Sequence, residues 1–242
     1  MEVLVENHRQ SSHDDIWRMF DRIAGRYDFL NHTLSFGQDI RWRKEVTRFL
    51  IDKNDQYILD LATGTADQLI YMLSYSNRIG RAVGVDLAVK MLDRGREKVK
   101  RKKLNNRIVL EKGNAENIEY ADNTFDAVTI SFGIRNVYNV EKALSEILRV
   151  LKPGGRVLIL EFSIPSNSVI RTVYLFYFRY ILRFMGSLVS GDKYAYRYLN
   201  ETVEGFPYGK RFTQFLTESG FRNTSIHPLS FGIATIYCGD KI

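Results

Sequence analysis

Residues 58–67 read Ile58-Leu59-Asp60-Leu61-Ala62-Thr63-Gly64-Thr65-Ala66-Asp67, an apolar run that ends in a turn of small residues. The pattern predicts a strand that delivers its carboxyl end into a Gly-containing turn, followed by a helix. Such a turn brings backbone N–H groups and a helix N-terminus up to a ligand, as nucleotide-binding folds do. Gly64 would let the backbone approach that ligand closely. A turn without a ligand is the alternative, because short motifs of this kind also occur by chance.

A second short apolar run, Arg81-Ala82-Val83-Gly84-Val85-Asp86, ends in a carboxylate 22 positions after Gly64. An acid near this spacing, at the end of the second strand, can accept hydrogen bonds from the two hydroxyls of a ribose. The two runs together predict a site for a ligand that contains a nucleoside.

Short β-rich runs alternate with helical runs from Tyr57 onward, which is typical of a doubly wound parallel sheet with helices on both faces. Lys152-Pro153-Gly154-Gly155 should end the last of these helices, because proline cannot continue a helix and glycine accepts positive φ. We expect strands at 57–61, 82–86, 107–110, 125–132 and 156–162, and helices that begin at 67, 89 and 140.

The N-terminal part should be helical. Residues 1–12 are polar and are expected to be flexible. Two helices, 14–23 and 40–50, should precede the first strand, with a polar-aromatic break at 25–31 between them.

The C-terminal part contains a predicted helix at 209–219 and two apolar strands at 223–227 and 232–238. Their short connection makes these strands antiparallel neighbours, so the sheet should include one reversed strand.

An aromatic-rich region at 169–185 is interrupted by Arg171, Arg179 and Arg183, which makes it too short and too charged to span a bilayer. We expect an insertion helix that either packs on the domain or covers an apolar ligand and touches a membrane surface. Within one domain at 13–242 we distinguish a helical flap at 13–55, a cofactor-binding core at 56–163, a helical lid at 164–208 and a final helix and strand pair at 209–242.

The composition fits one α/β domain, with 242 residues of which 45% are hydrophobic. The net charge is +7, and much of it lies at Lys98–Lys103, at the end of a predicted helix. Cations there stabilise the helix dipole, so we expect a solvated helix end. Attraction to an anionic membrane or to nucleic acid is the alternative.

Cysteine and histidine are sparse. Cys238 is the only cysteine, which excludes intrachain disulfides and thiolate clusters and favours a reducing compartment. The four histidines are scattered without metal-site spacing, so we predict no metal. No secretory signal and no apolar run of about 18 residues is present, and we expect a cytoplasmic protein.

Several stretches of the chain are distinctive. They are Met19–Ala24 with Arg26–Asn31, Asp60–Thr65, Asn114–Glu116, Phe125-Asp126 with Ile130–Val137, Arg149–Arg156 with Glu161–Ser163, and Ala195–Leu199. These stretches closely resemble the ubiquinone/menaquinone biosynthesis C-methyltransferases, from about Met19 to the end of the chain. The family implies a class I S-adenosylmethionine-dependent methyltransferase fold. This Rossmann-like fold has a seven-stranded sheet, mostly parallel with one antiparallel strand, and here adds N-terminal helices and the aromatic-rich insertion.

The resemblance implies S-adenosylmethionine as co-substrate and assigns residues to it. Thr65 would lie in the first turn, Asp86 on the ribose hydroxyls, and Asn114 and Ala115 beside the adenine. Ser131 would complete the site at the end of the fourth strand, and Gly64 would line it with its backbone.

The implied reaction methylates a ring carbon of a polyprenylated quinol. Loss of a hydroxyl proton gives a phenolate whose charge is shared onto that carbon, so the enzyme must favour the phenolate and align it. We expect Arg135 and Asn136 to position the quinol oxygen, with Arg135 stabilising the anion and a water relaying the proton. Tyr27 would close the methyl-transfer site from the flap.

The implied acceptor also determines the expected partners. Residues 174–185 would form a wall for the polyprenyl tail, so we expect peripheral association with the inner face of the membrane. A homodimer or a quinone-synthesis complex is open, and no nucleic-acid partner is expected. Demethylmenaquinol is favoured as acceptor over the benzoquinol precursor of ubiquinone.

The chain departs from the family pattern at three positions. Ala66 stands where glycine is usual, which adds a methyl group and disfavours positive φ. Asp39 replaces a histidine before Trp42, and Leu30 stands where methionine is common.

Three other functions are weaker. Tyr138 and Lys142 form a dehydrogenase-like pair, but the first turn places Asp67 where a pyrophosphate would be repelled. A nucleic-acid methyltransferase would need a clamp for a flipped base, which Ser131–Ile134 does not resemble. A cofactor-free scaffold of a quinone-synthesis assembly is the non-enzymatic alternative.

Overall fold

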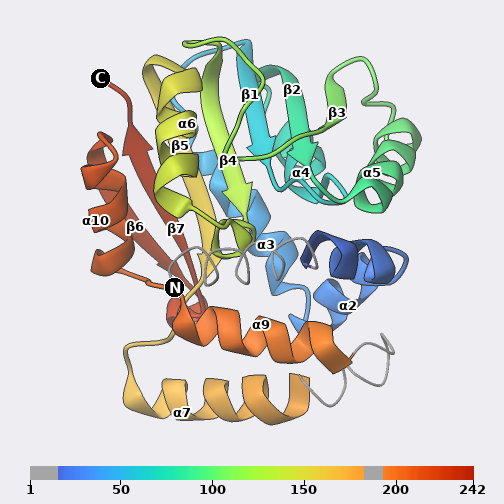
Figure 1. Ribbon diagram of the computed structural model, residues 1–242, viewed down its shortest axis with the longest axis vertical. Coiled ribbons are helices and arrows are strands. Elements are labelled where there is room, and N and C mark those ends of the chain that lie inside the picture. Colours follow the sequence, from blue (N-terminus) through green and yellow to red (C-terminus); the bar gives the residue numbers. More distant parts are fainter. Residues whose placement is uncertain (1–15, 183–192) are drawn as a thin grey trace, which may run out of the picture.

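Seven strands form one sheet at the centre of the molecule (Figure 1), in a computed structural model that describes residues 16–182 and 193–242. The strand order is β3-β2-β1-β4-β5-β7-β6, and β7 is antiparallel to both neighbours while the other pairs are parallel. This confirms the predicted doubly wound sheet with one reversed strand. The strands are β1 (Gln56–Leu61), β2 (Ile79–Asp86), β3 (Ile108–Lys112), β4 (Phe125–Ser131), β5 (Leu151–Phe162), β6 (Arg222–Leu229) and β7 (Ala234–Asp240).

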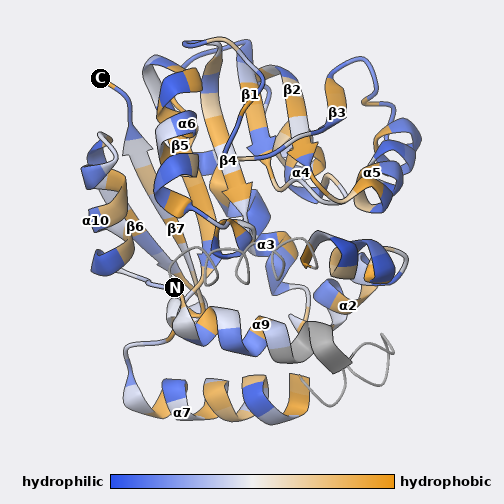
Figure 2. Cartoon of the chain, in the orientation of Figure 1, coloured by the Kyte–Doolittle hydropathy of each residue, from blue (hydrophilic) through white to orange (hydrophobic). Residues whose placement is uncertain are grey.

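Helices cover both faces of the sheet, because successive strand residues point to opposite sides. Ile58 and Ala127 pack in a hydrophobic cluster with α3, α4 and α5, whereas the following residues, Leu59 and Val128, pack with α6 and α10. Figure 2 shows the central strands as largely hydrophobic and the outer helix surfaces as hydrophilic. These helices are α3 (Gln38–Val46), α4 (Asp67–Tyr75), α5 (Val89–Arg101), α6 (Val140–Val150) and α10 (Lys210–Glu218).

A helical layer lies beyond the carboxyl ends of the parallel strands, where α7 and α9 run side by side (Figure 1). Leu30, Leu34 and Phe178 are buried in the cluster that holds this layer together. The layer consists of a helical stretch at 16–23, α2 (Tyr27–Leu34), α7 (Ser168–Phe176), a π-helical turn η3 (Tyr177–Leu182) and α9 (Lys193–Gly205). Segment 1–12, expected to be flexible, and Arg183 lie outside the described residues.

Two predicted boundaries were wrong. The break expected at 25–31 is confined to a turn at 24–26, after which α2 begins at Tyr27, so α2 is an additional helix between the two that were predicted. Leu30 and Leu34 lie one turn apart and are both buried, which favours helix although the flanking residues are polar. Strand β5 begins at Leu151, before the Pro-Gly-Gly segment, which forms an irregularity in the β4–β5 pairing.

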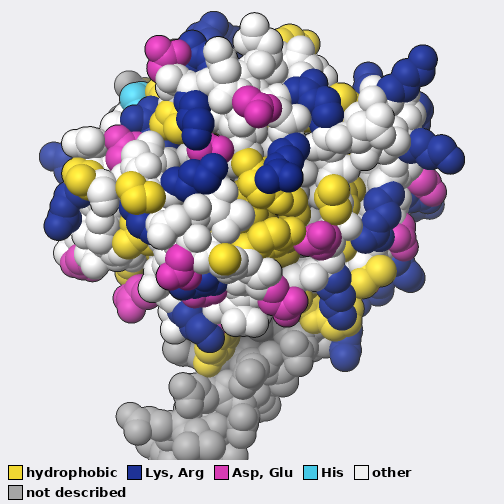
Figure 3. Space-filling view, turned by 90° about the horizontal axis from the view of Figure 1, so that it is seen from above, with side chains coloured by type: hydrophobic (Ala, Val, Ile, Leu, Met, Phe, Trp, Pro, Cys, Tyr) yellow, Lys and Arg dark blue, Asp and Glu magenta, His cyan; other side chains and the backbone are white. Residues whose placement is uncertain are grey.

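The basic end of α5 was predicted to be solvated, and this is wrong for Lys98. Its ammonium lies 2.6 Å from Asp28 Oδ2 and also contacts the Asp67 carboxylate, whereas Lys100 and Arg101 are exposed as expected. Seen from above, on the side away from α7, Lys and Arg side chains are dispersed and interspersed with acids around a small hydrophobic area (Figure 3).

Candidate functional site

The first turn and Asp86 meet at the carboxyl ends of β1 and β2. Gly64 N–H donates to Asp86 Oδ2 at 2.8 Å, and Ala88 N–H donates to Asp86 Oδ1 at 2.8 Å. Burial raises the pKa of the Asp86 carboxyl, while the two backbone N–H groups act in the opposite direction. Each carboxylate oxygen retains a free lone pair, so Asp86 can still accept hydrogen bonds from a diol.

Two polar atoms next to this turn are buried and unpartnered. Asp60 Oδ1 accepts from Thr129 Oγ1 at 2.5 Å, but neither Asp60 Oδ2 nor Thr63 Oγ1 has a partner among the described residues. Burial raises the pKa of Asp60 to about 6, while the nearby hydroxyls of Thr129 and Thr63 and the charge of Arg43 act in the opposite direction. Unsatisfied buried acceptors are costly, and they suit a ligand that carries an ammonium or hydroxyl group.

The turn keeps a left-handed backbone in spite of Ala66. Ala66 has φ 64° and is fully buried, and Gly64 has φ 55°. A left-handed alanine costs about 1–2 kcal/mol, so the turn carries local backbone strain at Ala66.

Thr65 is engaged within the protein. Its Oγ1 donates to Asp28 Oδ1 at 2.5 Å and lies 3.1 Å from Lys98 Nζ. The hydroxyl therefore ties the flap helix α2 and helix α5 to the first turn.

The remaining predicted cofactor residues flank the same strand ends. Gly113 N–H donates to the Asp86 carbonyl at 3.1 Å, which holds the turn containing Asn114 and Ala115 beside β2. Asn114 Oδ1 accepts from Glu116 N–H at 2.9 Å, and Ala115 packs on the core.

Ser131, at the end of β4, connects two helices to the sheet. Its Oγ donates to Gln68 Oε1 at 2.8 Å, and Gln68 Nε2 donates to the Arg43 carbonyl at 3.1 Å. Helices α3 and α4 are therefore fixed against the strand that carries the predicted catalytic loop. The next residue, Phe132, has φ 58°, a strained conformation of the kind found at functional sites.

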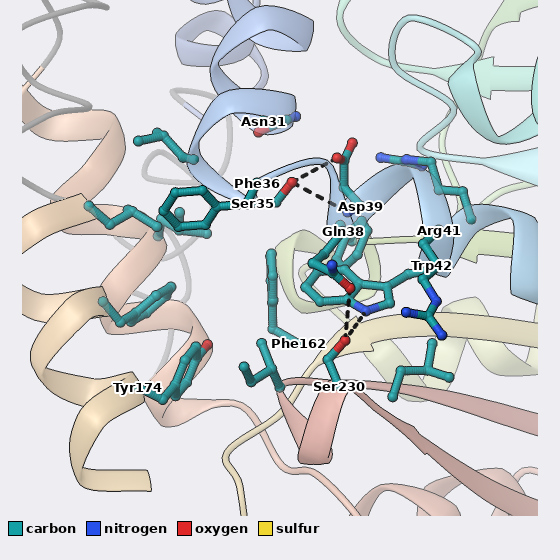
Figure 4. A pocket seen from close by; sticks show the side chains of 18 of the residues that line it. Asn31, Ser35, Phe36, Gln38, Asp39, Arg41, Trp42, Phe162, Tyr174 and Ser230 are labelled. Carbon is teal, nitrogen blue, oxygen red and sulfur yellow. Dashed lines mark hydrogen bonds between the residues drawn. The ribbon is translucent and has the colours of Figure 1, made fainter. Parts of the chain in front are cut away.

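A cavity of about 1630 Å³ opens between the strand ends and the helical layer (Figure 4). Its wall is mostly apolar and combines the flap, the loop after β4, α7 and the β6–β7 connection. Phe36 and Tyr174 lie on the α7 side, and Trp42 lies on the opposite side, where its indole N–H donates to Ser230 Oγ at 2.9 Å. The volume suits a bulky apolar ligand.

Arg135 reaches this cavity from the loop after β4 and is paired. Its Nη1 lies 2.6 Å from Glu161 Oε1, with both side chains almost fully buried, and also donates to the Phe132 carbonyl. Its Nε has no partner within the described ranges. Asn136 connects to the cavity through Tyr198, whose hydroxyl donates to Asn136 Oδ1 at 3.0 Å.

Tyr27 lines the same cavity from α2, with its ring edge-on to Phe20 at 5.9 Å. Burial raises the pKa of the Tyr27 hydroxyl, while Arg43, a hydrogen bond with Asn31 and the charge of Arg135 act in the opposite direction. The hydroxyl thus lies within electrostatic reach of two guanidinium groups.

Asp39 belongs to a polar network on the cavity wall. Its carboxylate oxygens lie 2.7 Å from Ser35 Oγ and 2.7 Å from His32 Nδ1 (Figure 4 shows the Ser35 bond). His32 Nε2 is 3.9 Å from Asp67 Oδ2. Asp39 is thus anchored by side chains of α2 and the turn that follows it.

Arg43 is the residue of this site that the sequence reasoning missed. Asp39, Trp42, Arg43 and Val46 are the buried residues of α3 and follow the i, i+3, i+4, i+7 spacing of one helix face. Two charged side chains on such a face are unusual, and that spacing was the signal that could have found them.

The residues at the strand ends fit S-adenosylmethionine. The unpartnered Asp60 Oδ2 suits its ammonium group, and Asp86 suits its ribose hydroxyls. Within the described ranges, no group of three or more His, Cys, Asp or Glu side chains could hold a metal ion.

Comparison with known proteins identifies close relatives along almost the whole chain. Residues 7–241 match the model of the ubiE/COQ5 methyltransferase family. The ubiquinone/menaquinone biosynthesis C-methyltransferase UbiE of Geobacter sulfurreducens is 44% identical, over 92% of this chain and 87% of the relative. The demethylmenaquinone methyltransferase of Thermus thermophilus is 44% identical, over 92% of this chain and all of the relative, and that of Bacteroides fragilis is 38% identical, over 94% and 93%.

Solved structures share the fold at lower identity. A putative S-adenosyl-L-methionine-dependent methyltransferase of Methanococcus maripaludis aligns with TM-score 0.63 at 22% identity, covering 92% of this chain and 94% of its own. The [4+2]-cyclase SpnF aligns with TM-score 0.66 at 14% identity, covering 93% of this chain and 94% of its own. Because a cyclase shares it, the fold alone does not determine the reaction.

Proposed function

Since the chain belongs to the ubiE/COQ5 methyltransferase family, we propose that it methylates a ring carbon of demethylmenaquinol, giving menaquinol. The S-adenosylmethionine-dependent methylation step in quinone biosynthesis follows from the family and from relatives at 38–44% identity. Some relatives are named for demethylmenaquinone alone and others for both ubiquinone and menaquinone. We favour the naphthoquinol because the menaquinone step appears in the names of both kinds. The observation that carries the proposal is the large, mostly apolar cavity lined by Tyr27 and Arg135. The residues assigned to the cofactor do not line it, but Phe132, which follows Ser131 in the chain, does.

We assign the cofactor to the carboxyl ends of β1, β2 and β4. Asp86 would accept hydrogen bonds from the ribose hydroxyls, and the backbone of Gly64 would lie along the ligand. Thr65, whose hydroxyl is engaged, would act by holding the turn. Asn114 and Ala115 would flank the adenine. Ser131 would complete the site at the end of β4, where its hydroxyl donates to Gln68.

Arg135 and Asn136 are assigned to the quinol oxygen, and Tyr27 to closure of the site. When bound, S-adenosylmethionine supplies a methyl group, and the electron pair of the sulfur–carbon bond that breaks stays on the sulfur. The acceptor first loses a hydroxyl proton, and its ring carbon then forms the new bond with the electron pair of the ring. That carbon afterwards loses its own hydrogen as a proton while the oxygen regains one, which restores aromaticity and releases one proton in total.

We further propose that the exposed face of α7 and η3 rests on the membrane surface. Val169, Val173, Phe176 and Tyr180 follow helical spacing and are all exposed, while Tyr174 on the other face is buried. Val169 and Val173 of this face also line the cavity, so an acceptor with an apolar tail would enter from this side. No helix in the described ranges is long and apolar enough to cross a membrane.

The double variant Val173→Asp/Phe176→Asp should bind anionic phospholipid vesicles about 100-fold more weakly. Each replaced side chain would otherwise gain about 1.5 kcal/mol or more from leaving water. Co-sedimentation measures the effect. The control is Val109→Asp, at a position 52% exposed on edge strand β3, which should bind like the unmodified protein. Equal vesicle binding by all three proteins would exclude this face.

The acceptor assignment is tested with purified protein, S-adenosylmethionine and vesicles containing either demethylmenaquinol or the benzoquinol precursor. Mass spectrometry should detect one added methyl group on the naphthoquinol, and no reaction with the oxidised demethylmenaquinone, which has no hydroxyl to ionise. Faster methylation of the benzoquinol would overturn the choice of acceptor.

A further inference from the structure

Arg43 is a buried cation that lacks a counter-ion among the described residues. Its side chain leaves α3 toward the cavity, and the residue is only 8% exposed. Within residues 16–182 and 193–242, the guanidinium has no hydrogen bond or salt bridge, and its Nε is buried without a partner. A buried unpaired charge is strongly unfavourable in a folded protein unless a ligand compensates it.

The surroundings of Arg43 point to the acceptor region. Its Cζ lies 5.2 Å from the centroid of the Phe132 ring, and Phe132 packs at 4.5 Å on Phe162. Arg135 lies over that second ring, with its Cζ at 5.4 Å. The two guanidinium groups therefore flank one aromatic pair in the wall of the same cavity.

The two arginines differ in how closely a carboxylate approaches them. Glu161 forms an ion pair with Arg135 at 2.6 Å, whereas no carboxylate of the described residues lies within ion-pair distance of Arg43. Other titratable groups within electrostatic reach of Arg43 are Tyr27 on α2, Asp60 at the end of β1 and Tyr71 on α4. Arg41 and Lys44 also line the cavity but are more exposed to water than Arg43. An anion in the buried part of the cavity would therefore meet its strongest attraction at Arg43.

We infer that Arg43 binds the ionised hydroxyl of the aromatic acceptor and stabilises its phenolate form. The inference rests on the proposed methyl transfer and adds a second catalytic arginine to it. Arg43 supplies the net positive charge, and Arg135, already paired, mainly orients the oxygen. The competing ligand is the carboxylate of S-adenosylmethionine, but Arg43 lines the apolar cavity with Phe132 and Phe162.

The test measures phenol ionisation directly. The absorbance of bound 1-naphthol, which differs between naphthol and naphtholate, is titrated above pH 7 in the presence of S-adenosylhomocysteine. Asp60 is already ionised in this range, because its pKa is about 6. In Arg43→Met the pKa of bound 1-naphthol should be higher by roughly 1 to 3 than in the unmodified protein, since a nearby cation favours the anion by this amount.

The rate of methyl transfer by Arg43→Met should fall by about 10²–10³-fold, which is typical of the loss of one donor that stabilises an anion. Arg43→Lys should restore part of both effects. The midpoint of thermal unfolding should not fall, because the variant removes an unpaired buried charge. The matched control Arg101→Met, at the exposed end of α5, should leave all these measurements unchanged.

Two outcomes would overturn the inference. One is an unchanged titration of 1-naphthol in Arg43→Met. The other is weaker binding of S-adenosylmethionine with unchanged binding of 5′-methylthioadenosine, which lacks the carboxylate and would identify that group as the ligand. If the unmodified protein ionises 1-naphthol through Arg43 yet does not methylate demethylmenaquinol, the inference stands and the proposed function fails.

Discussion

Replacing Arg135 with methionine is expected to lower turnover by about 10²–10³-fold while leaving the affinity for S-adenosylmethionine unchanged. The oxygen of the acceptor would lose a positioned donor, but the hydrogen bonds of the Arg135 side chain go to Phe132 and Glu161 and not to the residues assigned to the cofactor. The variant should also lose about 3–5 kcal/mol in free energy of unfolding, because Glu161 would remain buried and unpaired. Steady-state kinetics, calorimetry with the cofactor and chemical denaturation measure the three quantities.

A second variant separates catalysis from stability. Arg135→Met/Glu161→Gln removes both charges. The Phe162 N–H now donates a hydrogen bond to Glu161 Oε1 at 2.8 Å, and the amide oxygen of the glutamine can still accept it. We expect this double variant to regain most of the stability but not the turnover. Recovery of both would mean that Arg135 is only structural.

Asp86→Asn should weaken S-adenosylmethionine binding by about 100-fold or more, since hydrogen bonds to a charged acceptor contribute about 1.5–3 kcal/mol each and two hydroxyls are involved. Isothermal titration calorimetry measures the change. The control Asp93→Asn removes an exposed carboxylate of α5 that pairs with Arg96 and should bind the cofactor normally. If Asp86→Asn binds as tightly as this control, the ribose assignment is incorrect.

The sequence predicted those features that depend on neighbours along the chain. Alternating β-rich and helical runs placed the turn that contains Gly64 and the strands that end at Asp86 and Ser131, and the short β6–β7 connection predicted the reversed strand. Helix α2 was missed because polar residues around Tyr27 suggested a break, while burial of Leu30 and Leu34 by α7 and η3 stabilises a helix.

Long-range electrostatics could not be predicted in the same way. Lys98 belongs to a basic run, yet its partners Asp28 and Asp67 lie 70 and 31 residues away in the chain. Arg43 likewise had a local signal, its place on the buried face of α3, but only the folded structure places its side chain beside Phe132, with no counter-ion in the described part of the chain. Pairing of charges depends on which elements pack together, which local patterns do not specify.

The central claim is that this chain methylates demethylmenaquinol. It is tested most directly by mass spectrometry of the quinones of cells with and without the protein. We predict that cells lacking it accumulate demethylmenaquinone at the expense of menaquinone, and that the unmodified gene, but not one encoding Arg135→Met, restores the normal profile. An unchanged quinone profile in its absence would contradict the account.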